Sequence, residues 1–182
     1  FSASSTYVSG STLSVPEPLS TSQTLVLSGE QYIREVLEQA RKVRVVAERH
    51  LGGPAKEATF VVSPSWKRTM AQGALSFIEE GGHPKQFISA LREMPFLEGE
   101  RKGEMIGFWG KKMLPQVFKW DDASKAMVSS DMNESEVLEA AKEFIAAELQ
   151  LQTVNVVVGE SDGDGTGRAN SAMPLSPAVV YA

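Results

Sequence analysis

Two short runs of β-branched and aromatic residues, set far apart by helical sequence patterns, most constrain how this chain folds. The first is Thr59–Ser63 and the second is Thr153–Val158, and both have the composition of β-strands. A third run, Ala178–Tyr181, follows a loop rich in glycine and aspartate. The order helix, strand, helices, strand, loop, strand predicts an α+β fold, with a long N-terminal helix before a small β-sheet packed with about four helices.

A long amphipathic helix is predicted from Ser28 to about His50. Ser28 and Gln31 have the spacing of a capping box, in which each side chain satisfies the backbone N–H of the other residue. Apolar residues then recur at three- and four-residue steps, at Ile33, Val36, Leu37, Ala40, Val43 and Ala47. The sequence Gly52–Pro54 is typical of a helix end.

The helical patterns between the strands have recognisable starts and ends. A helix is predicted to begin at Pro64, with Ser63 as its cap, and to end at about Glu80 before Gly81. A shorter helix is predicted to begin at His83–Pro84. The pattern over Glu104–Phe118 has a buried stripe of Ile106, Trp109, Met113 and Val117, with a kink expected at Pro115.

The last helix before the second strand is predicted over Asn133–Leu149, where Asn133 is the N-cap and Glu136 takes the reciprocal position. Its predicted buried face comprises Val137, Leu138, Ala141, Phe144, Ile145 and Leu149.

Composition excludes several kinds of chemistry. The 182 residues include no cysteine and two histidines, so disulfides, thiolate nucleophiles and cysteine zinc sites are absent. We find no catalytic constellation, and we expect no metal and no cofactor in this chain. The loop Ser161–Gly167 matches neither a calcium loop nor a phosphate loop completely and is predicted to be a turn-rich connection. No apolar run is long enough to span a membrane, and we expect a cytoplasmic protein.

Charge is distributed unevenly along the chain, although the net charge is −5. Basic residues outnumber acidic residues between Thr59 and Trp120, whereas acidic residues dominate Asp121–Asp164. Lysines and arginines lie near four aromatic residues, Trp66, Phe108, Trp109 and Trp120. This combination favours RNA binding, because the cations neutralise phosphates and aromatic rings can stack on exposed bases. The alternative is that these aromatic residues form core and the lysines are ordinary surface.

Several sequence segments, in this order, resemble the C-terminal region of leucyl-tRNA synthetases of the archaeal and eukaryotic cytosolic type. They are GEQYIREVLEQARKV at Gly29–Val43, TFVVSPSWKRT at Thr59–Thr69, SALREMPFL at Ser89–Leu97, GKKMLPQVFK at Gly110–Lys119, TVNVVVGE at Thr153–Glu160 and RANSAMPLSPAVVYA at Arg168–Ala182. The resemblance covers roughly Ser28 to Ala182, and its specificity comes from the order and spacing of the segments.

Residues 1–27 lie outside the resemblance, and their Ser/Thr-rich composition predicts a linker or an insertion. The resemblance implies that residues 28–57 end the anticodon-binding helical domain and that residues 58–182 form a C-terminal tRNA-binding α+β domain. The whole enzyme is an ATP- and magnesium-dependent ligase that joins leucine to its tRNA, and its catalytic signatures do not occur here. This chain alone is therefore expected to be non-catalytic, with leucine tRNA as partner, other synthetases as further candidates, and neither DNA nor a membrane.

Positive charge alone selects the candidate phosphate contacts. They are Lys111, Lys112 and Lys119, followed by Arg101, Lys102 and Lys67. A rival hypothesis from another class is a protein-interaction module, in which the helices over 28–50 and 133–149 dock partner helices in a larger assembly.

Overall fold

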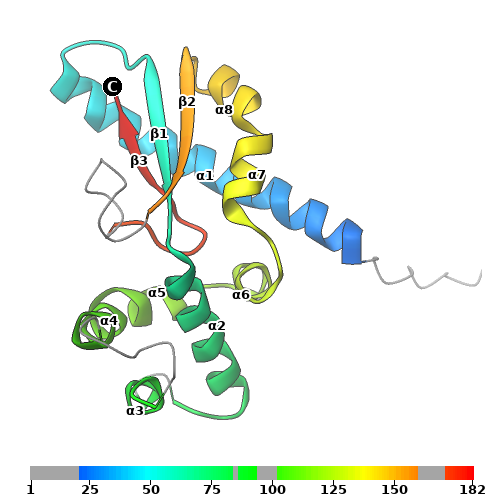
Figure 1. The fold of residues 1–182 in the computed structure, drawn as a ribbon. Helices are drawn as coiled ribbons and strands as arrows, with labels where there is room; N and C mark the ends of the chain where they lie inside the picture. The colour runs from blue at the N-terminus through cyan, green and yellow to red at the C-terminus, as the bar shows by residue number, and fades with distance from the viewer. Residues whose placement is uncertain (1–20, 84–85, 94–101, 160–170) are drawn as a thin grey trace, which may run out of the picture.

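The sheet organises the fold, as Figure 1 shows for a computed structural model that describes residues 21–83, 86–93, 102–159 and 171–182. The predicted α+β class and all three predicted strands are confirmed. β1 (Glu57–Val62) is central, pairing in parallel with β2 (Thr153–Val158) and antiparallel with β3 (Ala178–Tyr181). Because parallel strands need a crossover, the helices between β1 and β2 form that connection.

The long helix α1 (Thr21–Leu51) begins earlier than predicted. Residues 21–27 contain neither glycine nor proline, so nothing ends the helix at Ser28. Ser28 lies inside the helix, and the predicted capping box is wrong because the side-chain amide of Gln31 donates to Glu35 at 3.0 Å. The predicted end is confirmed, since Gly52 has a φ of +72° and its N–H donates to the Glu48 carbonyl.

The predicted apolar stripe of α1 is its packed face. Ile33, Val36, Leu37 and Ala40 are buried, while Val43 and Ala47 are half-buried against the same core. Tyr32, which the stripe does not include, is also fully buried. In Figure 1 α1 runs behind the strands, and the sheet, α1, α7 and α8 lie at one end of the molecule.

The other end of the molecule is helical (Figure 1). It comprises α2 (Ser65–Glu79), α3 (Phe87–Leu91), α4 (Lys102–Phe108), the π-helical turn η2 (Trp109–Met113), α5 (Leu114–Val117) and α6 (Asp122–Ser129). An aromatic cluster fills its interior, where the Phe87 ring lies 5.6 Å from the Phe77 ring and 4.8 Å from the Trp109 ring between centroids. Sequence reasoning missed α6, although Asp121 caps it by accepting from the Ser124 N–H at 2.8 Å.

The predicted helix over residues 133–149 is two helices, α7 (Glu134–Ala140) and α8 (Lys142–Glu148), with a break at Ala141. The predicted cap is confirmed, because Asn133 accepts from the Ser135 N–H. Glu136 accepts from the side-chain amide of Asn133 at 2.8 Å. Leu138, Ile145 and Leu149 are buried as predicted, but Phe144 is 54% exposed.

Candidate nucleic-acid interface

The predicted basic residues near Trp109 lie on one continuous helical run, formed by α4, η2 and α5. Trp109, Met113 and Val117 face the core and are almost fully buried. This stripe directs Lys111 and Lys112 outward, and both residues are exposed. Lys119 follows α5 and is exposed as well. We call Gly110–Lys119 the basic segment.

A wide π-helical turn shapes the basic segment. The N–H of Leu114 donates to the carbonyl of Trp109, five residues back, instead of four. Pro115 comes next and has no N–H to donate to the carbonyl of Lys111. The predicted kink at Pro115 therefore takes the form of a π turn immediately before the proline, which places both lysines on a widened part of the helix.

Phe118 is the exposed aromatic residue of the basic segment, with 61% of its surface accessible. Sequence reasoning missed it. The available signal was its position directly after Val117, the last residue of the buried stripe, so that Phe118 falls off the core face. Phe118 and Lys119 thus place an aromatic ring beside a cation on the surface.

Two of the four aromatic residues proposed from the sequence to stack on bases belong instead to the core. Trp109 is fully buried and Trp120 is 7% exposed. Trp66 and Phe108 are half-buried and contact each other edge to face, with 5.3 Å between ring centroids. The alternative given above, that these residues are core, therefore holds for Trp109 and Trp120.

Lys67 must be removed from the predicted phosphate contacts. Its side chain is 1% exposed, and its ammonium group donates to the Ala172 carbonyl at 2.7 Å. The same group lies 4.6 Å from the centre of the Phe108 ring and 5.6 Å from that of Trp66, so the aromatic faces stabilise its charge. Lys67 thus ties α2 to the segment before β3.

The remaining two predicted contacts are not placed. Arg101 lies outside the described residues. Lys102 is the first residue of α4, but its side chain lies outside the described part of the structure. The predicted loop Ser161–Gly167 also falls outside the described residues. Among the described residues, the candidate interface therefore comprises Lys111, Lys112 and Lys119, with Phe118 added by the structure.

A buried polar cluster lies where the two ends of the molecule meet. The Glu134 carboxylate accepts from Arg68 and Tyr32, at 3.1 Å each, and from the Leu175 N–H at 3.0 Å. Arg68 also donates to the carbonyls of Met127 and Ser130. The cluster therefore joins α1, α2, α7 and the segment before β3.

Burial controls the ionisation of this cluster. It raises the pKa of Glu134 although the guanidinium of Arg68 opposes the change. Burial, followed by the charge of Glu134, also raises the pKa of Tyr32 well above its ordinary value. Each polar group named here has hydrogen-bond partners, and we interpret the cluster as structural.

The described residues contain neither a metal-ligand cluster nor a membrane-spanning helix. Nowhere in residues 21–83, 86–93, 102–159 and 171–182 do three or more histidine, aspartate or glutamate side chains gather as metal ligands would. Within the same ranges, none of the helices is long and apolar enough to cross a membrane. Comparison with models of known protein families gave no match, and comparison with curated protein sequences gave none either.

Proposed function

We propose that this chain is the C-terminal tRNA-binding part of a leucyl-tRNA synthetase of the archaeal and eukaryotic cytosolic type. The observation that carries the proposal is the basic segment, on which Lys111, Lys112 and Lys119 are exposed together with Phe118. The order of sequence segments described above and the α+β architecture with its long first helix support it. The whole enzyme would act in the cytoplasm.

The basic segment suits RNA in two ways. Its lysines can neutralise backbone phosphates, which gives affinity without base specificity. The exposed ring of Phe118 can stack on an unpaired base, and RNA-binding proteins commonly recognise such bases in loops and bulges. The acidic helices α7 and α8 would repel the same backbone, so we expect the RNA to bind the helical end of the molecule.

The role of this part within the enzyme would be to position the substrate. The reaction would join leucine to tRNA with ATP in a catalytic domain elsewhere in the enzyme, and this chain supplies no catalytic residue in our proposal. Contacts that hold the tRNA body at a distance lower the entropic cost of placing its acceptor end. Binding energy far from the reacting atoms can thereby raise the rate.

A titration at controlled salt concentration tests the proposal. The chain is titrated with a leucine tRNA and with the same tRNA lacking its long variable arm, and binding is measured by fluorescence anisotropy. We expect tighter binding to the intact tRNA and affinity that falls steeply as salt rises. Equal binding to both RNAs would leave only general RNA affinity, and no binding to either by the folded chain would overturn the proposal.

A further inference from the structure

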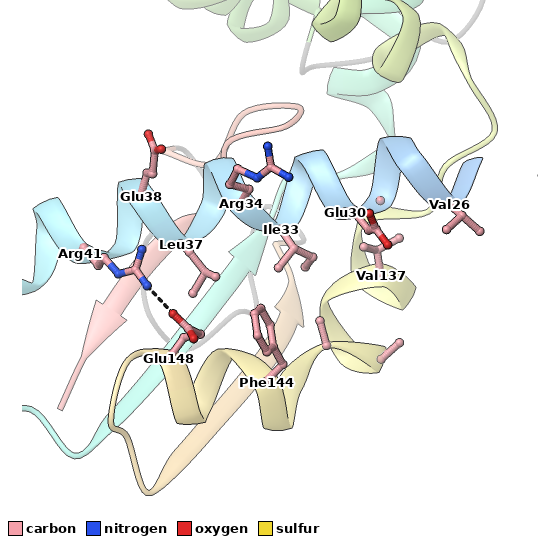
Figure 2. A pocket seen from close by; sticks show the side chains of 13 residues that line it. Val26, Glu30, Ile33, Arg34, Leu37, Glu38, Arg41, Val137, Phe144 and Glu148 are labelled. Atoms are coloured by element: carbon pink, nitrogen blue, oxygen red, sulfur yellow. Dashed lines mark hydrogen bonds and ion pairs between the residues drawn. The ribbon is translucent and has the colours of Figure 1, made fainter. Parts of the chain in front are cut away.

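An open apolar groove runs between α1 and the helix pair α7–α8, on a different part of the molecule from the basic segment. It encloses about 900 Å³. Figure 2 shows Ile33 and Leu37 on α1 facing Phe144 on α8, with Val26 and Val137 farther along. Val26 and Phe144 are 62% and 54% exposed. Ile33 and Leu37 are only 8% and 5% exposed and form the floor, so Val26 and Phe144 supply the exposed apolar edges of the groove. Exposed apolar surface rimmed by polar residues is a feature of interaction sites.

The spacing of the lining residues matches an α-helix as the occupant. The α1 wall carries Val26, Gly29, Ile33 and Leu37 at steps of three and four residues, which span about 16 Å at 1.5 Å per residue. On the opposite wall, small side chains at Ala140 and Ala141 leave room for the backbone of a third helix. Side chains at i, i+3, i+4 and i+7 of an added helix would fit between these two rows.

The charges around the groove indicate which charge the bound helix would carry beside its apolar stripe. Arg41 and Glu148 form an ion pair of 2.6 Å across one end, visible as the dashed line in Figure 2, and this pair closes the groove there. Along the α1 wall, Glu30 and Glu38 are exposed on either side of Arg34. The adjoining pair α7–α8 has four exposed glutamates and one lysine, while its fifth glutamate, Glu134, is buried beside Arg68. The surroundings are thus acidic overall, which favours a basic partner.

We infer that this groove binds an amphipathic α-helix of a partner polypeptide, with apolar residues at i, i+3, i+4 and i+7 and lysines or arginines beside them. A glutamate-flanked helix of the same apolar pattern would be rejected, because it would bring like charges together at the rim. This surface is separate from the proposed RNA interface, so one chain could hold both partners at the same time.

Two designed peptides serve as probes. Both are 18-residue helices with the same leucine stripe, and one has lysines beside the stripe where the other has glutamates. Each is titrated into the full 182-residue chain and followed by fluorescence anisotropy at 0.1 M salt. The lysine peptide should bind at least tenfold more tightly than the glutamate peptide.

Variants of the chain locate the binding. Ala140→Trp fills the groove from an exposed position and should weaken binding of the lysine peptide at least tenfold. Phe144→Ala removes an exposed apolar contact without adding bulk, and it should also weaken binding. The matched control is Val45→Ala, because Val45 is a similarly exposed apolar residue of α1 outside the groove. Circular dichroism checks that each variant is folded.

Several outcomes would overturn the inference. One is equal binding of the two peptides, and another is unchanged binding by both groove variants in the folded state. A third is a dimer in analytical ultracentrifugation that Ala140→Trp converts to monomer, because the groove would then be an interface between copies of this chain.

Discussion

The basic segment and the helix pair α7–α8 are alike in construction and opposite in charge. Each is an interrupted helix, broken by the π turn η2 in one and at Ala141 in the other. Each buries one apolar stripe and leaves one phenylalanine, Phe118 or Phe144, more than half exposed. The basic segment carries three lysines, whereas α7–α8 carries five glutamates and one lysine. In our proposals each exposed ring contacts a partner, and the charges of its segment select the class of that partner.

The largest expected effect concerns the junction between these two regions. Arg68→Ala would leave the buried Glu134 without its cation and would remove the Arg68 donor from the carbonyls of Met127 and Ser130. The Met127 carbonyl would keep the Ser130 hydroxyl as a donor. We expect the free energy of unfolding to fall by about 3–5 kcal/mol, because removing one partner of a buried ion pair strands the other charge.

Urea denaturation measures that loss, and Arg41→Ala is the matched control. Arg41 and Glu148 form an exposed pair, with side chains 51% and 42% accessible, so its loss should cost less than about 1 kcal/mol. Equal losses for the two variants would mean that the Glu134 cluster does not join the two ends of the molecule.

The next largest effect tests whether the lysines of the basic segment bind tRNA. Replacing Lys111 and Lys112 together with alanine should weaken tRNA binding roughly 10–50-fold at 0.1 M salt and lower the salt slope by about 0.7–0.9 per lost phosphate contact. The control removes the same charge from the sheet end of the molecule, as Lys42→Ala on α1 with Lys142→Ala on α8. An unchanged slope in the first double variant would exclude the two lysines from the interface.

A smaller effect tests whether the exposed ring of Phe118 contributes to tRNA binding. Phe118→Ala should weaken tRNA binding at least fivefold with little change in salt slope, since base stacking contributes about 1–3 kcal/mol and involves no counterion release. Phe118→Trp should retain binding. Phe144→Ala is the matched control on the acidic side and should leave tRNA affinity unchanged. If both alanine variants behaved alike, the position of the ring would not matter.

The local elements were largely predictable because their signals are local. The strands over 153–158 and 178–181, the end of α1 at Gly52 and the cap at Asn133 each follow from residues within a few positions. The errors arose where local rules compete. Ser28 is a residue type that often caps helices, yet the residues before it continue the helix. The apolar pattern over 133–149 does not reveal the break at Ala141.

The site was less predictable because burial of charge depends on distant partners. Lys67 receives its carbonyl partner from Ala172, and Glu134 receives donors from Tyr32 and Arg68. None of these pairs is close in sequence, so charge counting placed Lys67 on the surface. Lys111, Lys112 and Lys119 do lie on the surface, because the buried stripe of the preceding helical run determines which side faces solvent. Their contact with RNA stays a prediction.

The final prediction concerns pH. Since burial raises the pKa of Glu134 above its ordinary value of 4.5, the folded state holds this proton more tightly than the unfolded chain. The stabilisation that this group contributes is complete below its ordinary pKa. It is lost as the pH rises from about that value through the higher pKa of the folded state. Groups with lowered pKa, such as Asp121 beside the Ser124 N–H, contribute in the opposite direction.

Comparison with Glu134→Gln isolates the Glu134 contribution, because the other groups are the same in both proteins. Urea denaturation between pH 4 and pH 7 should show the wild type losing stability relative to the variant as pH rises. The two proteins should differ least near pH 4, because a protonated Glu134 and a glutamine are both neutral beside Arg68. A difference that stays constant with pH would mean that Arg68 fully offsets burial, so that Glu134 ionises equally well in the folded and unfolded chain.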